Sequence, residues 1–233
     1  MDKYILFDFD GTLLFMDQDE FVQNYYKALY KKFHSIGLDP KKCSDAIVKA
    51  VYLVITNDDN ISNEEKFWNV FESKTNISQN ELRPMLDEFY SHDFCQIKEC
   101  TQVNPYAKEV IKCLKNKGYK IILATNPVFP KQATYERIRW AGLDASDFEY
   151  ITTYENSCYC KPNLHYYQEL IDKFNLDAKN TWMIGNDMYE DGISTKLGMK
   201  VIITTDNLID KKEKYDVDYI LSWEELSNKI KEL

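Results

Sequence analysis

Hydrophobic and polar residues follow two different patterns along this chain, and the change of pattern divides it into two parts. From Asp19 to about His92 apolar residues recur every three or four positions, which is typical of amphipathic helices. Four helices are predicted there, with apolar positions Phe21, Tyr25, Leu29 and Phe33, then Ala46, Ile47, Ala50, Val51 and Val54, then Phe67, Val70 and Phe71, then Leu82, Met85, Leu86, Phe89 and Tyr90. Short polar joints separate these segments, so we expect a small helical bundle.

The rest of the chain alternates short apolar runs with helical segments. The runs predict strands at residues 4–7, 119–124, 150–153, 181–184, 200–204 and 218–221. Helices are predicted between them at residues 105–117, 131–141, 163–174, 189–197 and 223–231. This alternation predicts an α/β fold with a doubly wound, mostly parallel sheet. Because the first strand belongs to that sheet, the bundle is an insertion: we expect a core domain of residues 1–15 and 97–233 and a four-helix cap domain of residues 16–96.

Composition and charge limit the classes of partner. The chain has 233 residues and a net charge of −9, which argues against a nucleic-acid backbone as its main partner. A small phosphorylated substrate stays compatible with this charge, because a bound cation can reverse its sign locally. No apolar run is long enough to span a bilayer, and the first residues lead into a strand without a signal-peptide pattern. Six cysteines fit a reducing compartment as free thiols, so we expect a cytoplasmic protein.

Two carboxylates directly follow the first predicted strand. Asp8 and Asp10 lie one residue apart and are followed by Gly11 and Thr12. Two acids so close repel each other unless a cation or a shared proton relieves them. The carboxyl ends of strands are also where open α/β sheets bind their ligands. We therefore expect a divalent metal ion at this position, the alternative being an Asp-Gly turn whose acids are merely solvated.

Three further segments carry polar groups at or near strand ends. Thr125 and Asn126 follow a strand and offer a hydroxyl and a backbone N–H to phosphoryl oxygens. Lys161 precedes a proline and a predicted helix, where an ammonium could neutralise such oxygens, although most lysines are surface charges. Asp187 and Asp191 follow another strand, and acids four apart at such a turn can coordinate a cation directly and through its water.

These four segments resemble, in order and spacing, the four motifs of the haloacid dehalogenase-like (HAD) phosphatases. The matching residues are Asp8-x-Asp10-Gly-Thr-Leu13, Thr125-Asn126, Lys161, and Gly185-Asn186-Asp187 with Asp191. The resemblance extends from residue 3 to about residue 205 and is close to the phosphoglycolate phosphatase-like branch, whose cap lies between the first two motifs. It implies a Rossmann-like core, an inserted helical cap and Mg²⁺ as cofactor.

The resemblance also implies a role for each motif residue. Asp8 is expected to be the nucleophile and Asp10 the general acid and base. Phosphate is expected to contact Thr125, Asn126, Lys161 and Gly11. Mg²⁺ is expected at Asp8, Asp10, Asp187, Asp191 and Asn186.

The fourth motif departs from the commonest form of the family. Asn186 follows Gly185 where an acid is usual. The spacing from Asp187 to Asp191 favours Asp187 as the direct metal ligand, while Asn186 stays an alternative and Glu190 a weaker one.

The predicted function is hydrolysis of a small phosphorylated metabolite, dependent on Mg²⁺, through an aspartyl-phosphate. A phosphosugar mutase and a non-catalytic protein that binds a phosphorylated ligand are the alternatives. Phosphoglycolate, sugar phosphates and nucleoside monophosphates are all compatible substrates, and monomer and homodimer are both open. Residues 15–17 are expected at a hinge or entrance, and the aromatic residues that could line a substrate pocket are Tyr25, Tyr26, Phe67 and Trp68.

Overall fold

The computed structural model describes residues 2–210 and 215–232, and these form a six-stranded sheet in which all neighbouring strands are parallel. The strand order is β5-β4-β1-β6-β7-β8. The strands are β1 (Lys3–Phe7), β4 (Tyr119–Leu123), β5 (Tyr150–Ile151), β6 (Trp182–Gly185), β7 (Lys200–Thr204) and β8 (Tyr219–Leu221). The predicted α/β fold with a doubly wound parallel sheet is therefore confirmed.

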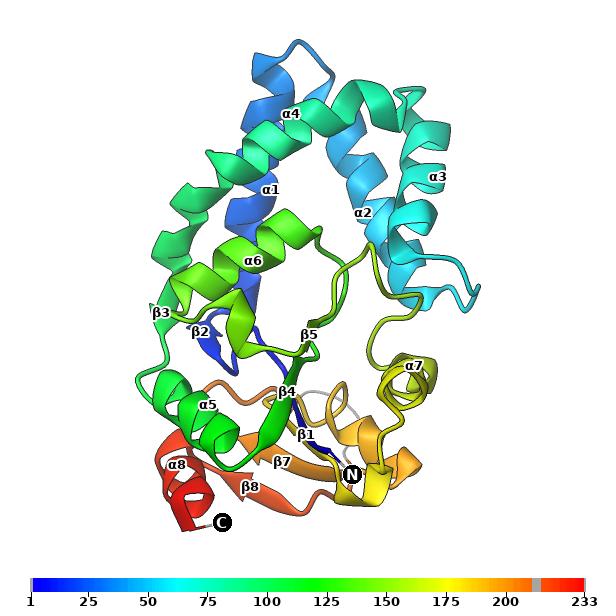
Figure 1. The fold of residues 1–233 in the computed structure, drawn as a ribbon. Helices are drawn as coiled ribbons and strands as arrows, with labels where there is room; N and C mark the ends of the chain where they lie inside the picture. Colours follow the sequence, from blue (N-terminus) through cyan, green and yellow to red (C-terminus); the bar gives the residue numbers. More distant parts are fainter. Residues whose placement is uncertain (1, 211–214, 233) are drawn as a thin grey trace.

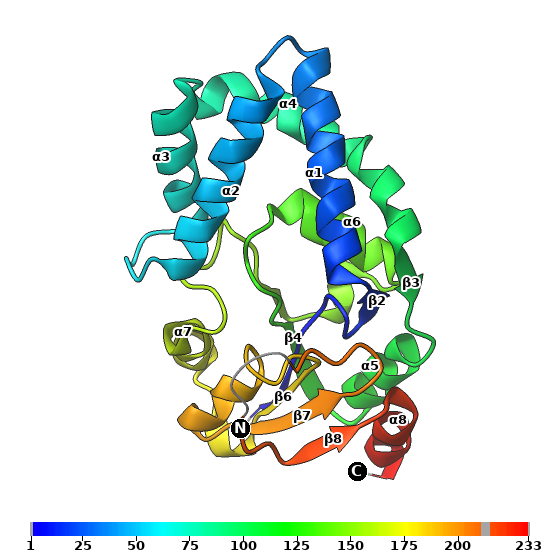
Figure 2. The ribbon, with the colours of Figure 1, turned by 180° about the vertical axis from the view of Figure 1, so that it is seen from behind.

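Helices cover both faces of this sheet (Figure 1). They are α5 (Ala107–Asn116), α7 (Leu164–Phe174) and α8 (Trp223–Glu232). The helix α6 (Lys131–Trp140) lies between the sheet and the cap. Short 3-10 helices are η2 (Ala145–Asp147), η3 (Ala178–Asn180) and η4 (Gly192–Leu197). Alternate residues of β1 face opposite sides: Ile5 and Phe7 belong to the hydrophobic cluster beneath α5 and α8, whereas Tyr4 and Leu6 belong to the one beneath α7. Figure 2 shows the sheet from behind, with β7 beside β8 and α8 following β8. A sheet buried on both faces explains why its strands are almost wholly apolar.

The helical insertion lies at one end of the sheet (Figures 1 and 2). Its elements are α1 (Gln18–Ser35), α2 (Pro40–Thr56), α3 (Asn63–Thr75), α4 (Gln79–Ser91) and the 3-10 helix η1 (Phe94–Cys100). Each α-helix begins at a side chain that accepts a backbone N–H three residues on, namely Asp17, Asp39, Ser62 and Ser78. The four predicted helices are confirmed, and the predicted α1 positions Phe21, Tyr25, Leu29 and Phe33 are all buried.

Two short strands connect this insertion to the sheet. β2 (Leu14–Met16) and β3 (Thr101–Val103) pair antiparallel, with Leu14 opposite Val103. Neither strand was predicted, because three residues carry too little periodicity to be recognised. The elements α1 to η1 all lie between β2 and β3, while the division at residues 15/16 and 96/97 stays a prediction.

Two helical predictions differ from the structure. A helix was expected over residues 189–197, but only the 3-10 helix η4 forms there. The preceding residues form a turn because side chains take its backbone N–H groups: Asp187 Oδ1 accepts from Tyr189 and Glu190, and Asp191 Oδ2 accepts from Asn186. In α3 the predicted positions Phe67 and Val70 are only half-buried, whereas Phe71 is buried together with Lys66 and Trp68. Lys66 is satisfied there because its Nζ donates to the carbonyls of Asn57 and Cys158.

The cap and core are in direct contact along α6. This helix packs against α4 and η1 and also against the connecting strands β2 and β3. Aromatic rings fill the joint: Phe129, just before α6, contacts Phe21, Tyr25 and Phe94 of the cap at centroid distances of 5.2 to 6.5 Å. All six cysteines are free thiols. Among the described residues, no helix combines the length and apolar character needed to cross a membrane.

Candidate active site

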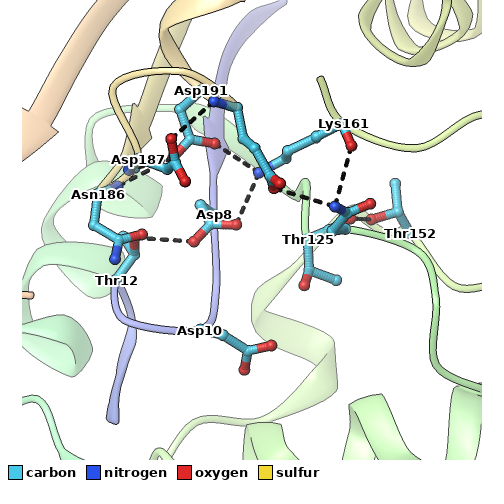
Figure 3. Close-up of polar contacts among 12 residues, drawn as sticks. Asp8, Asp10, Thr12, Thr125, Thr152, Lys161, Asn186, Asp187 and Asp191 are labelled. Carbon is cyan, nitrogen blue, oxygen red and sulfur yellow. Dashed lines mark hydrogen bonds and ion pairs between the residues drawn. The ribbon is translucent and has the colours of Figure 1, made fainter. Parts of the chain in front are cut away.

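Three neighbouring parallel strands end together beneath the cap and position the first group of side chains. In the sheet register, Phe7 of β1 lies between Leu123 of β4 and Ile184 of β6. Asp8 is the next residue, and it is 8% exposed. The alternative of a solvated Asp-Gly turn is therefore wrong for Asp8, since this residue is buried. Figure 3 shows its carboxylate facing Lys161.

Lys161 holds two of the buried carboxylates. Its Nζ donates to Asp8 Oδ1 at 2.8 Å and to Asp191 Oδ1 at 2.7 Å. The side chain is 1% exposed, so it is not one of the solvated lysines of the surface. Burial disfavours its charged form, but the carboxylates of Asp191 and Asp8 outweigh this and hold the pKa of Lys161 well above its ordinary value. The ammonium is thus charged at neutral pH.

Asp191 anchors the turn after β6. Its Oδ2 accepts the backbone N–H groups of Asn186 and Asp187, both at 3.1 Å. A Cβ at Gly185 would lie 2.0 Å from that oxygen, so only glycine leaves room for this contact. Burial raises the pKa of Asp191 to about 6, although the Lys161 ammonium opposes the rise.

Thr12 connects Asp8 to Asn186. The Thr12 hydroxyl lies 3.1 Å from both Asp8 Oδ2 and Asn186 Oδ1, and it can donate its proton to either. The Asn186 amide nitrogen donates to the carbonyl of Asn207 at 2.6 Å, which leaves its oxygen free to accept from Thr12. Thr12 was not named among the predicted site residues, although its place two residues after Asp10 could have drawn attention to it.

Gly11 makes room for this arrangement. Its φ is +80°, and a Cβ there would lie 2.3 Å from Asn186 Nδ2. Its backbone N–H donates to the carbonyl of Leu14 at 2.8 Å, so that donor is already used. The role of Gly11 in binding phosphate stays a prediction.

Asp10 points away from Asp8 and Lys161 (Figure 3). Its Oδ2 forms an ion pair with Arg137 of α6, whose side chain is fully buried. Its Oδ1 is buried without a hydrogen-bond partner. Burial raises the pKa of Asp10, while the guanidinium of Arg137 opposes the rise. The sequence interpretation missed Arg137, yet it lies four residues after Ala133 on the apolar side of its helix, where an arginine is conspicuous.

Thr125 and Asn126 lie on the other side of Asp8. The Thr125 carbonyl accepts hydrogen bonds from the hydroxyls of Thr152 at 2.7 Å and Tyr166 at 3.0 Å, which holds this turn in place. The Asn126 amide donates to Glu190 Oε2 at 3.1 Å, and its own Oδ1 is buried without a partner. The turn is therefore anchored through its backbone.

An excess of carboxylates over cations surrounds the site. The acids are Asp8, Asp10, Asp187, Glu190 and Asp191, and the buried cations are Lys161 and Arg137. Burial raises the pKa of Glu190 to about 7; Lys161 opposes the rise and the neighbouring aspartates add to it. Carboxylate oxygens with unbalanced negative charge suit a hard divalent cation such as Mg²⁺.

Side-chain carboxylates alone would not complete a metal shell here. Among the described residues, no three His, Cys, Asp or Glu side chains are gathered closely enough to hold a metal ion. Two further oxygens are those of the Asn186 amide, which shares the Thr12 hydroxyl with Asp8, and of the Asp10 carbonyl, which accepts a 3.4 Å hydrogen bond from Gln18. A Mg²⁺ ion could be bound by this mixed set of oxygens.

A cavity of about 310 Å³ opens from these residues toward the cap. Tyr25 and Tyr26, two of the predicted pocket aromatics, line it, whereas Phe67 and Trp68 line a smaller neighbouring cavity of about 40 Å³. A larger hollow of about 690 Å³ lies beside the site and is lined by residues 15–17, together with Asn186, Asp187 and Glu190. Residues 15–17 thus adjoin the site, and their role as a hinge or entrance stays a prediction.

Comparisons with solved structures agree with this fold. No curated protein matches the chain. Among solved structures, a HAD phosphatase from Thermococcus onnurineus is similar with a TM-score of 0.60 and 18% identity, covering 98% of this chain and 97% of that one. A predicted phosphoglycolate phosphatase from Haemophilus somnus 129PT has a TM-score of 0.58 and 19% identity, covering 97% of each chain. CbbY from Rhodobacter sphaeroides, in complex with phosphate, has a TM-score of 0.59 and 17% identity, covering 97% of this chain and 96% of that one.

These structural likenesses establish the fold, and a family model extends the comparison to the sequence. The model for haloacid dehalogenase-like hydrolases matches residues 3–193, which is most of the chain and includes all four motifs. The chain belongs to the haloacid dehalogenase-like hydrolases.

Proposed function

We propose that this protein is a Mg²⁺-dependent phosphatase that hydrolyses a small phosphomonoester through an aspartyl-phosphate on Asp8. The observation that carries the proposal is the environment of Asp8, a buried carboxylate held by Lys161 and Thr12 at the end of a cavity. A nucleophile needs this kind of fixed orientation toward the substrate. The similarity to structures described as phosphatases supports the same reaction class.

The roles of the two acids come from the resemblance and are part of the proposal. Asp8 would attack the phosphorus, the bond to the leaving oxygen would break, and Asp10 would donate a proton to that oxygen. A water molecule would then attack the aspartyl-phosphate while Asp10 takes back a proton, releasing phosphate and restoring Asp8. Burial raises the pKa of Asp10, which is the direction that a general acid needs.

Positive and hydrogen-bonding groups would stabilise the phosphoryl oxygens. Lys161 lies against Asp8 and would reduce the negative charge that builds up as the phosphoryl group is transferred. Thr125 lines the cavity beside Asp8 and would supply its hydroxyl, and Asn126 its backbone N–H. These roles come from the resemblance and are part of the proposal.

Mg²⁺ would be held by Asp8, the Asp10 carbonyl and the fourth motif. Asn186 Oδ1 shares the Thr12 hydroxyl with Asp8, whereas Asp187 Oδ1 accepts N–H groups of its own turn. This geometry supports Asn186 as the ligand beside Asp8, with Asp187 and Asp191 completing the acidic surroundings. When bound, the ion would supply positive charge that neutralises the phosphoryl oxygens during transfer.

Phosphate release from a panel of phosphomonoesters tests the proposal. The wild-type protein is assayed with Mg²⁺ and with chelator, beside the Asp8→Asn variant and a control with the same chemical change, Asp45→Asn, at an exposed position on α2. We expect release by wild type and control that needs Mg²⁺, and none by Asp8→Asn. Release that persists in Asp8→Asn would contradict the proposal. A phosphosugar mutase would instead convert a sugar phosphate to its isomer, and a binding protein would do neither.

The remaining expectations about the setting of this activity rest on sequence. The cytoplasmic location and the exclusion of nucleic acid as a partner stay predictions, and monomer and homodimer both stay open. The proposed partner is a small phosphorylated metabolite that reaches Asp8 through the cavity beneath the cap.

A further inference from the structure

The cavity above Asp8 has two chemically different ends. At the sheet end lie the carboxylates and amides of the site. At the cap end the lining is apolar and aromatic, from Phe21, Val22, Tyr25 and Tyr26 of α1, Val51 of α2, and Phe129 of the loop after β4. A phosphoryl group at Asp8 would place the rest of the substrate, its leaving group, against this apolar end.

No described residue that lines this cavity is a lysine, an arginine or a histidine. The cations nearby already have partners: Lys161 is paired with Asp8 and Asp191, and Arg137 is paired with Asp10 and stacked on Phe129 at 4.5 Å. Arg83, in the small neighbouring cavity, is paired with Glu64. A second anionic group on the substrate would lose its hydration here and gain no counter-charge, which is strongly unfavourable.

Part of the apolar lining is held in place by contacts within the protein, and part of it is exposed. The Tyr25 hydroxyl is bonded to the hydroxyl of Tyr90 at 2.8 Å, so Tyr25 presents its ring to the cavity. Phe129 contacts Tyr25 edge-on at 5.2 Å, which fixes both rings. Val22 remains 43% exposed, and Tyr26, one turn later on α1, is half-buried. Apolar surface that is left uncovered inside a cavity is available to be covered by a ligand.

We propose that the substrate is a phosphomonoester whose leaving group is an uncharged alcohol with an apolar or aromatic body. The inference rests on the proposed function, because it takes the phosphoryl group to bind at Asp8. It disfavours substrates with a carboxylate or a second phosphate at the far end. The cavity volume of about 310 Å³ is at the lower limit for small-molecule sites, which suits a body about the size of one ring.

A series of primary alkyl phosphates tests this inference, since their leaving groups have similar basicity. The members are 2-phenylethyl phosphate, n-butyl phosphate, 3-carboxypropyl phosphate and butane-1,4-diol bisphosphate. We expect kcat/KM to be highest for the phenylethyl ester and at least about 10-fold lower for the two esters with a second anion. Equal or faster hydrolysis of the anionic esters would overturn the inference.

Val22→Lys provides a second test at the apolar end. A lysine there would place a cation facing the cavity, so we expect kcat/KM to rise for the carboxypropyl ester and fall for the phenylethyl ester. Val48→Lys is the matched control, because Val48 is a similarly exposed valine on α2 outside this cavity, and it should change neither value. An unchanged preference in Val22→Lys would contradict the placement of the leaving group.

Binding separates this inference from the proposed function. The same esters are titrated into the Asp8→Asn variant by calorimetry. Tighter binding of the phenylethyl ester without any turnover by wild type would support the apolar site and refute the phosphatase. Binding without preference, or a preference for the anionic esters, would overturn the inference whatever the turnover.

Discussion

Replacing Arg137 by methionine would test whether the buried guanidinium holds Asp10 in position. Arg137 is fully buried, pairs with the Asp10 carboxylate, and donates to the Ala133 carbonyl and to the Thr134 hydroxyl, both at 3.4 Å. Its guanidinium also covers the Phe129 ring at 4.5 Å. Methionine keeps most of the volume and apolar contact of arginine and removes the charge and the hydrogen bonds.

The structure sets the expected loss of stability. Removing one member of a fully buried ion pair costs about 3–5 kcal/mol, because the remaining charge is left uncompensated. The Asp10 side chain is 20% exposed and can recover some hydration, so we expect a loss of about 3 kcal/mol. Arg137→Lys keeps the charge but loses the planar fork and should cost about 1 kcal/mol. In the double variant Arg137→Met with Asp10→Asn, the loss of stability should be smaller than the sum of the two single losses by about 2 kcal/mol.

Two assays measure these effects. Urea unfolding of the wild type, both single variants and the double variant gives the coupling free energy between the two side chains. Phosphate release then compares an alkyl phosphate with p-nitrophenyl phosphate, whose leaving group needs little protonation. If Asp10 is the general acid, kcat/KM should fall about 100-fold for the alkyl ester and less than about 10-fold for the aryl ester in Arg137→Met.

Two results would refute this reasoning about Arg137. Stability losses that add within about 0.5 kcal/mol would mean that the pair contributes no coupling. An equal fall in kcat/KM for both esters would mean that Arg137 acts on the fold alone, without positioning the proton donor.

Three further predictions concern the same end of the sheet. Gly11→Ala should destabilise the protein by about 2 kcal/mol in urea unfolding, because φ is +80° and the new Cβ would meet Asn186 at 2.3 Å; unchanged stability would contradict this. Lys161→Met should cost about 3–5 kcal/mol at neutral pH, since it strands two buried carboxylates. Burial already raises the pKa of Asp191, so the folded variant binds protons more tightly than the unfolded chain. The stability of Lys161→Met should therefore fall from pH 5 to pH 8 in thermal unfolding, and a rise would contradict this. Asn186→Asp should lose the hydrogen bond to Asn207, which lowers stability by about 1–2 kcal/mol. The variant should nevertheless need about tenfold less Mg²⁺ for half-maximal phosphate release, and a higher Mg²⁺ requirement would argue against Asn186 as a ligand.

The sequence predicted the architecture well because its evidence is local and repeated. The change from helical periodicity to alternating strands and helices marks the insertion, and parallel strands require the helical crossovers that the chain supplies. Parallel topology also explains why Asp8, Thr125 and Asn186, distant in sequence, end at one edge of the sheet. Local sequence patterns did not predict the short strands β2 and β3 or the turn before η4. They depend on pairing between distant residues and on side chains that take backbone N–H groups.

The chain alone thus determined the order of elements, the helical cap and the polar residues at the strand ends. The tertiary structure decided which of those residues meet. It shows that Lys161 is buried and pairs with two carboxylates. In the sequence, only its position distinguishes Lys161 from the many other lysines. The tertiary structure also places Arg137 on Asp10 and gives the cavity an apolar end without a described cation. The physical reason is that periodicity encodes which face of an element is buried, whereas partners across elements are set by crossovers, strand register and the packing of α6 against the cap.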